Sequence, residues 1–205
     1  MKAYSTWSTR DTLQECREAC GGKGYLSENR IDALKNDTEV YTTFEGDNTV
    51  LMQLVAKSRL AEFRKSFGGM NAMGVINYVY ENVKTTIAEK NPIITRETDD
   101  EHLLDAQFHL EAFRYREKAT LDSSATRLKK LIDDGLDPYD AYNVVQHQLI
   151  DVSQAYIERI VLEQFQVAVQ SITDKNCKEI LSKLSQLYAL SHIERNKGWY
   201  LEDGY

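Results

Sequence analysis

Residues 121–160, LDSSATRLKKLIDDGLDPYDAYNVVQHQLIDVSQAYIERI, decide the fold class. Apolar residues recur at steps of three and four along both halves of this stretch, which is the period of one face of an α-helix. They are Leu121, Ala125, Leu128 and Ile132 in the first half, and Tyr142, Val145, Leu149, Val152, Tyr156 and Ile160 in the second. Between the halves, Gly135 is placed to end one helix, while Asp137 and Pro138 are placed to begin the next. Because the connection is short, the sequence predicts two antiparallel helices that face each other or a shared core.

Helix breakers are scarce in the rest of the chain. Only two prolines occur among the 205 residues, and seven of the ten glycines lie at or before Gly74. Long helices are therefore favoured over most of the sequence. Asp174 is placed to open a last helix that runs towards Ile193. No repeat period or low-complexity tract is visible, so the sequence predicts an all-α fold built of one or more helical bundles.

The amino-terminal residues predict shorter elements. They are a helix from Tyr4 to Cys20 ended by Gly21, an amphipathic segment at residues 31–34, an extended run at residues 40–44, and a helix towards Phe67 capped by Asp47 or Asn48. Glycines at positions 68 and 69 break that helix, and a further long helix is expected from Val75 to Ile87. Residues 91–99 contain Pro92 and form a linker. We therefore expect two helical domains, residues 1–90 and residues 91–205.

The composition excludes several classes of partner. A formal net charge of −7 would repel nucleic acids and anionic membranes. No run approaches the roughly 18 to 20 apolar residues of a membrane span, and the amino terminus has no basic segment leading into an apolar one. Cys16, Cys20 and Cys177 are too few and too odd in number for a disulfide framework. We expect an intracellular protein with no nucleic-acid or membrane partner, whose cysteines are buried or half-buried.

The histidines and cysteines give little support for a metal site. None of the four histidines has a glutamate three residues before it, as helical di-iron proteins require, and no His-Glu-x-x-His motif occurs. Cys16 and Cys20 are one helical turn apart, but no second cysteine pair exists, so ordinary packing is the better explanation. We therefore expect no metal.

Two short segments have residues suited to chemistry, and each has a simpler explanation. The glycines at positions 21, 22 and 24 can merely end a helix, or can let a phosphate or an adenine approach free backbone amides. Glu45 lies between Phe44 and Gly46. In an apolar, partly desolvated setting its carboxylate would have a raised pKa and could act as a base near neutral pH. Taken alone, the residues favour the simpler view of an exposed turn followed by a capping Asp47.

The two segments together resemble the paired signature of the acyl-CoA dehydrogenase and oxidase superfamily. Residues 15–25, ECREACGGKGY, and residues 42–50, TTFEGDNTV, occur in the family's order, and the spacing from Gly22 to Glu45 is also similar. The forms CREACGG and FEGDN resemble the oxidase branch, whereas the dehydrogenases usually have Tyr-Glu-Gly followed by Thr. The segment WYLEDGY at residues 199–205 resembles the oxidase tail.

The resemblance implies the carboxy-terminal helical part of a flavin-dependent acyl-CoA oxidase. In that family the catalytic carboxylate removes the α proton of an acyl-CoA, the β hydrogen leaves as hydride to FAD, and molecular oxygen then reoxidises the flavin to give hydrogen peroxide. The implied roles are Glu45 as catalytic base, Phe44 and Gly46 at the substrate, and Gly21, Gly22 and Asp47 at FAD. The two glycines would border the adenine or pyrophosphate of the partner subunit's FAD. Many dehydrogenases have a glutamine that contacts the flavin at the position of Glu18. Because this chain has glutamate there, the resemblance does not assign a flavin contact to Glu18.

The resemblance also implies a setting. It predicts a homodimer active in fatty acid β-oxidation, peroxisomal if eukaryotic and cytoplasmic if bacterial. Nothing in the chain matches the amino-terminal helical domain and the β domain that hold the flavin ring in this family, so we expect a piece of a larger enzyme that is inactive in isolation. Two alternatives stay open. One is an acyl-CoA dehydrogenase that passes electrons to an electron-transfer flavoprotein, and the other is a non-catalytic helical interaction module.

Overall fold

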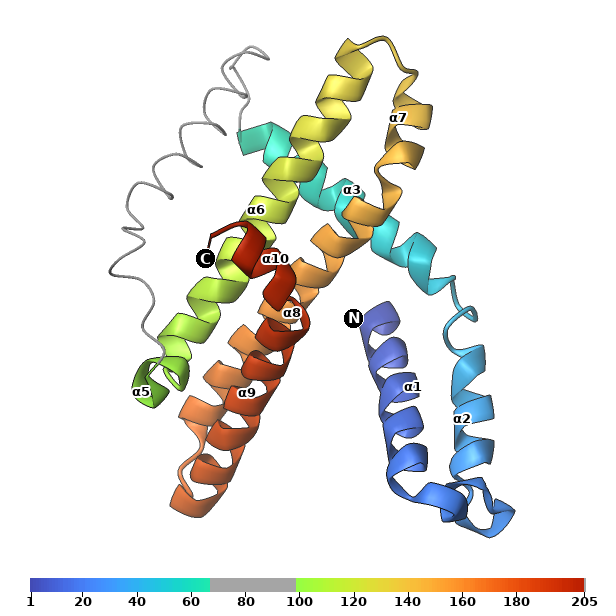
Figure 1. Cartoon of the computed structure of the whole chain (residues 1–205), viewed down its shortest axis with the longest axis vertical. Helices are drawn as coiled ribbons and strands as arrows, with labels where there is room; N and C mark the ends of the chain where they lie inside the picture. Colours follow the sequence, from blue (N-terminus) through green and yellow to red (C-terminus); the bar gives the residue numbers. More distant parts are fainter. Residues whose placement is uncertain (67–98, 205) are drawn as a thin grey trace. The chain divides into compact units, whose positions relative to one another are not determined.

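The computed structural model describes residues 1–66 and 99–204, and every regular element within these ranges is helical (Figure 1). The predicted all-α fold is confirmed. The chain forms two compact units, residues 1–59 and residues 60–205. The predicted division at residues 90 and 91, the break at Gly68 and Gly69, and the helix from Val75 to Ile87 lie outside the described residues. No helix in the described parts is long and apolar enough to cross a membrane.

Two long helices form the centre of the second unit. They are α6 (Ala106–Asp133) and α8 (Gln146–Ser171), which run antiparallel and pack together (Figure 1). Leu121 on α6 and Leu149 and Val152 on α8 are buried, as the apolar periodicity predicts. The helix α9 (Lys175–Arg195) packs on α8 and adds Ala189 to a core with Phe113 and Leu162. The short helices α5 (Asp100–Leu103) and α10 (Lys197–Glu202) flank this bundle.

The connection between α6 and α8 has the predicted turn chemistry, with one difference. Gly135 has a φ of +94°, and the Asp137 carboxylate accepts a hydrogen bond of 2.9 Å from the amide of Tyr139. Pro138 occupies the first turn of α7 (Pro138–Val144). The second apolar stripe is not one continuous helix, however, because the chain breaks at Val145 before α8 begins. Val145 is only 1% exposed, so its burial in the core continues the stripe across the break.

A buried ionic network joins the helices of this bundle. Arg116 on α6 donates to the carboxylate of Glu158 on α8, and His192 Nδ1 of α9 lies 3.3 Å from the same carboxylate. Burial alone would raise the pKa of Glu158, but the hydrogen bond with His192 and the charge of Arg116 hold that pKa below its ordinary value. The adjacent residues also pair, because Arg159 forms a salt bridge with Glu117. The pairing satisfies charges that would be costly to bury alone.

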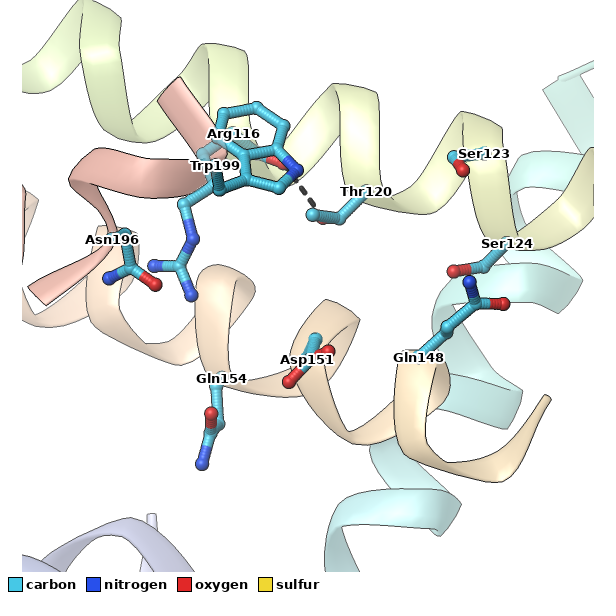
Figure 2. A pocket seen from close by; sticks show the side chains of 9 residues that line it. All are labelled: Arg116, Thr120, Ser123, Ser124, Gln148, Asp151, Gln154, Asn196 and Trp199. Atoms are coloured by element: carbon cyan, nitrogen blue, oxygen red, sulfur yellow. Dashed lines mark hydrogen bonds between the residues drawn. The ribbon is translucent and has the colours of Figure 1, made fainter. Parts of the chain in front are cut away.

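A polar pocket of about 280 Å³ opens beside this network (Figure 2). Figure 2 shows Arg116 extending from α6 towards α8, with Gln154 and Asp151 on α8 along the opposite wall. Asn196 and Trp199 close one end of the pocket. None of the residues that the sequence assigns to catalysis or cofactor binding lines it.

The first unit is built on a pair of helices joined by two 3₁₀ turns. α1 (Lys2–Ala19) packs against α2 (Ile31–Val40), and the turns η1 (Gly21–Tyr25) and η2 (Ser27–Asn29) connect them. Gly21 has a φ of +56° directly after the end of α1, as predicted for a left-handed cap. The helix α3 (Asn48–Ser66) follows and is capped by Asp47, also as predicted.

Two sequence-based expectations are wrong, one for this unit and one for the cysteines of both units. Residues 40–44 are not extended, because α2 continues through Val40 and the amides of Thr42 and Thr43 bond back to the carbonyls of Glu39 and Val40. The run of β-branched and aromatic residues suggested a strand, but intrinsic propensity is a weak guide where turn hydrogen bonds compete. The three cysteines, expected to be buried or half-buried, are all exposed.

Candidate active site

Glu45 sits at the apex of the turn that joins α2 to α3. Its φ is +57°, a left-handed conformation that non-glycine residues rarely adopt, and Gly46 follows with a φ of +99°. The side chains of Glu45 and Phe44 are exposed, and the Phe44 ring meets the edge of Tyr41 at a centroid distance of 6.5 Å. A residue held in this sparsely populated region stores about 1–3 kcal/mol of strain, and such strain clusters at functional sites.

Asp47 is engaged by the helix that it caps. Its Oδ1 atom accepts hydrogen bonds from the amides of Thr49 at 2.9 Å and Val50 at 3.3 Å. The carboxylate therefore satisfies two of the free amides at the start of α3 and complements the positive end of the helix dipole. Any contact of Asp47 with a cofactor would have to use the second oxygen.

Asn48 lies beneath the turn and is 1% exposed. Its backbone amide donates to the carbonyl of Thr42 at 2.9 Å, which closes the loop that carries Glu45. Its side-chain nitrogen donates to Thr6 Oγ1 at 2.8 Å and to the carbonyl of Ala3 at 3.3 Å. The loop is thereby attached to the first turns of α1.

Lys2 makes the second attachment between α1 and the turn. Its ammonium donates to the carbonyl of Gly46 at 2.7 Å and to Asn48 Oδ1 at 2.9 Å. Sequence reasoning did not find Lys2, and it considered Asn48 only as a possible helix cap. No local pattern signals such a residue, because Lys2 is 44 positions from the carbonyl that it binds.

The glycine turn has two different kinds of glycine. A Cβ on Gly22 would meet nothing within 4 Å, and the space around Gly21 is equally open. Gly24, in contrast, is buried against α1, because a Cβ there would lie 2.2 Å from the carbonyl oxygen of Arg17. The Arg17 guanidinium stacks over the Tyr25 ring at 4.5 Å from its centroid. The absence of side chains at Gly21 and Gly22 leaves their backbone open to the close approach of another group.

The structure brings one group of predicted site residues together and leaves the other apart. Phe44, Glu45, Gly46 and Asp47 form a single turn, which Lys2 holds to the start of α1. Gly21 and Gly22 follow the other end of the same helix. The 18 residues of α1 rise by about 27 Å, so the two motifs of one chain cannot contact the same end of a ligand. Among the described residues, no cluster of histidine, cysteine and carboxylate side chains is arranged to hold a metal ion.

Comparisons with known proteins match the chain on both sides of its undescribed segment. The family model described as acyl-CoA oxidase, C-alpha1 domain, matches residues 1–60, and the model described as acyl-CoA oxidase matches residues 105–205. Among curated proteins, the peroxisomal acyl-coenzyme A oxidase 2 of Arabidopsis thaliana is 38% identical over 98% of this chain and 29% of that protein.

Solved structures share the same arrangement of helices. The crystal structure of acyl-CoA oxidase1 from Yarrowia lipolytica matches with a TM-score of 0.80 and 26% identity, over 100% of this chain and 28% of that one. Acyl-CoA oxidase-2 of Caenorhabditis elegans, bound with FAD, ascaroside-CoA and ATP, matches with a TM-score of 0.78 and 20% identity, over 98% and 28% of the two chains. The chain thus spans less than a third of the length of these relatives.

Proposed function

The chain belongs to the acyl-CoA oxidase family, and from this membership we propose that it is the carboxy-terminal helical part of a flavin-dependent enzyme that oxidises acyl-CoA to trans-2-enoyl-CoA. The observation that carries the proposal is the turn at Glu45. A carboxylate is held there in a strained conformation, at the centre of the segment that resembles the family's base motif.

Glu45 acts as the base in this proposal. Its carboxylate is exposed, and a bound acyl chain would cover it together with Phe44 and exclude solvent. Desolvation raises the pKa of a carboxylate, and a base with a pKa closer to the working pH removes the α proton more effectively. Gly46 allows the turn itself to form, because its φ is +99° and a Cβ there would crowd the Leu51 side chain at 3.3 Å.

FAD is the cofactor that the residues fit. Gly21 and Gly22 offer open backbone, which suits the adenine or pyrophosphate part of the cofactor. The free oxygen of Asp47 is the group of the turn that would face the cofactor. When bound, FAD supplies the hydride acceptor and the reduction of molecular oxygen to hydrogen peroxide. The Caenorhabditis elegans relative bound with FAD and ascaroside-CoA supports both a flavin and a CoA thioester.

A homodimer explains why the two motifs lie about 27 Å apart in one chain. The glycine turn of one subunit then borders the FAD of its partner, while the Glu45 turn faces the substrate of its own subunit.

The compartment and the electron acceptor follow from the relatives. Names of relatives that include the word peroxisomal support the peroxisome for a eukaryotic source. A bacterial enzyme would be cytoplasmic. Peroxide release with acyl-CoA distinguishes this oxidase from a dehydrogenase that needs an electron-transfer flavoprotein.

Replacement of Glu45 by glutamine in the intact flavoenzyme that contains this chain tests the proposal. Glutamine keeps the shape of the side chain but cannot take a proton. Flavin content should stay unchanged, and anaerobic flavin reduction by acyl-CoA should fall at least about a hundredfold, the lower end for loss of a general base. Glu39→Gln, which removes an exposed carboxylate from the end of α2, is the matched control and should reduce normally. Rapid flavin reduction in the Glu45 variant would rule out the assignment.

A further inference from the structure

The turn that carries Glu45 is held by more than its own bonds. A left-handed φ at a non-glycine residue is unfavourable, so a loop free to relax would leave it. Within the loop, the Asn48 amide bonds to the Thr42 carbonyl, and the Asp47 side chain bonds to amides of α3. Neither interaction reaches the carbonyl of Gly46, so a bond to that carbonyl from another element adds a restraint.

α1 supplies that restraint through a connected set of hydrogen bonds. The Lys2 ammonium donates both to the carbonyl of Gly46 and to the side-chain oxygen of Asn48. Asn48 is itself hydrogen-bonded to α1, because its side-chain nitrogen donates to Thr6 Oγ1. The Thr6 hydroxyl in turn donates to the backbone carbonyl of Lys2 at 3.0 Å. Lys2, Asn48 and Thr6 thus form a closed ring of contacts, and the carbonyl next to Glu45 is attached to it.

The hydrogen bonds of Lys2 are directed away from its own helix. Lys2 is half-buried, and both acceptors of its ammonium belong to residues 46 and 48. A charge-assisted bond to a backbone carbonyl is stronger than a neutral one, so it can hold the plane of the Gly46 peptide.

We infer that Lys2 and Asn48 are positioning residues that fix the direction of the Glu45 carboxylate for proton abstraction. The inference rests on the proposed function of Glu45 as the base. Neither residue touches the substrate or takes a proton in the reaction. They act through the backbone of residues 45 and 46, and a misplacement of the base by about 1 Å can lower the rate roughly a hundredfold.

Substitutions in the intact flavoenzyme test this role. Lys2→Met keeps much of the side-chain length but removes the ammonium, and Lys2→Arg restores a charged donor. With Lys2→Met, anaerobic flavin reduction by acyl-CoA should slow by about 10- to 100-fold, while the KM for acyl-CoA and the flavin content change less than about twofold. Lys2→Arg should recover most of the rate. Lys57→Met removes an exposed lysine from α3 and should reduce at the unaltered rate.

A double variant separates positioning from general weakening of the fold. If Lys2 acts only through Glu45, then Lys2→Met should add almost nothing to the loss already caused by Glu45→Gln, because residues that act as a unit are not additive. A further tenfold loss in the double variant would overturn the inference. Thr6→Val removes one acceptor of Asn48 without touching the turn, and it should give a smaller loss of about 3- to 10-fold if Lys2→Met fails to fold.

The outcomes also distinguish this inference from the proposed function. If Lys2→Met and Thr6→Val both reduce flavin within twofold of the unaltered rate while Glu45→Gln does not, the positioning role is wrong and the base assignment stands. If Glu45→Gln itself reduces flavin rapidly, the proposed function fails first. A rate that falls only in proportion to lost flavin would show that Lys2 supports the fold alone, which also overturns the inference.

Discussion

Gly24 and Gly22 belong to the same turn, yet their surroundings predict opposite effects of an added methyl group. A Cβ on Gly24 would lie 2.2 Å from the backbone oxygen of Arg17, which cannot move without opening the turn against α1. Gly24→Ala should therefore lower the free energy of unfolding by about 1–3 kcal/mol, as overpacking does elsewhere. Urea unfolding of the chain, followed by helical circular dichroism, measures this loss.

Gly22→Ala is the matched control for that experiment. Nothing lies within 4 Å of the added Cβ, so stability should change by less than about 0.5 kcal/mol. In the intact flavoenzyme the same variant should lose FAD more readily if the cofactor binds at the open space beside Gly22, as we propose. Unchanged flavin retention would mean that Gly22 serves only to end α1.

Asp122 gives the stability of the chain a pH dependence of predictable sign. Burial raises the pKa of this carboxyl from 3.8 to about 6, and the nearby charge of Lys118 opposes that shift only in part. The folded state therefore holds the proton more tightly than the unfolded state. Ionisation of Asp122 destabilises the protein as pH rises from about 4 to about 6, by up to about 3 kcal/mol, and the loss is complete above that range.

Asp122→Asn removes this effect while it keeps the shape of the side chain. The variant should be about 1–3 kcal/mol more stable than the unaltered chain at pH 7.5 and nearly equal to it near pH 4. Urea unfolding at the two pH values checks the difference. Asp134→Asn, at an exposed position after α6, should show no such change. Equal stabilisation at both pH values would show that the ionisation of Asp122 is not the cause.

Single residues were predictable where their role depends on near neighbours in the sequence. Asp47, Asp137 and Gly21 have local roles as helix caps, and the structure places each as expected. Lys2 was not predictable, because its acceptors lie 44 and 46 positions away and a lone lysine gives no signal. The exposure of Cys16 was not predictable either. Its apolar spacing shows that it shares a helix face with Leu13 and Cys20, but not whether another element packs on that face.

Among the helices, α8 has Leu149 as one of its fully buried apolar residues. Its side chain is 0% exposed. Leu149→Ala should lower the free energy of unfolding by about 2–5 kcal/mol, because the lost contacts leave a cavity that neighbours fill only in part. Leu187→Ala on α9, where the side chain is 61% exposed, should change stability by less than about 0.5 kcal/mol. Similar small losses in both variants would place Leu149 outside the core.

Helices were easier to predict where the periodic apolar pattern extends over more residues. The stripes of α6 and α8 extend over several turns and were found with the correct orientation. The segment at residues 40–44 was misjudged because five residues are too few to separate a helix end from a strand by pattern. The break at Val145 was also missed, because no proline or glycine marks it and the stripe passes through without interruption.

At the scale of the whole molecule, the pair of helices α1 and α2 buries little apolar surface. Only Ala3 is buried in this pair, whereas α3 buries Met52 and Ala56. Leu34 and Val40 of α2 are each about half exposed. A helix pair with so few buried side chains gains little from hydrophobic burial to offset the entropy lost on folding. We therefore expect its stable form to need surfaces that the rest of the intact oxidase supplies.

That dependence leads to a prediction for the chain on its own. The amides of α1 and α2 should exchange with solvent much faster than those of α6 and α8, because local stability follows buried contacts. Hydrogen exchange measured by mass spectrometry would show the difference, and equal protection of the two helix pairs would contradict it.

The isolated chain should also bind little FAD, because its two motifs lie about 27 Å apart and cannot enclose one cofactor. Equilibrium dialysis against FAD should find no micromolar affinity. If such affinity appears, the residues of this chain alone are sufficient to form the flavin site, and the proposed sharing of that site between subunits and domains is wrong.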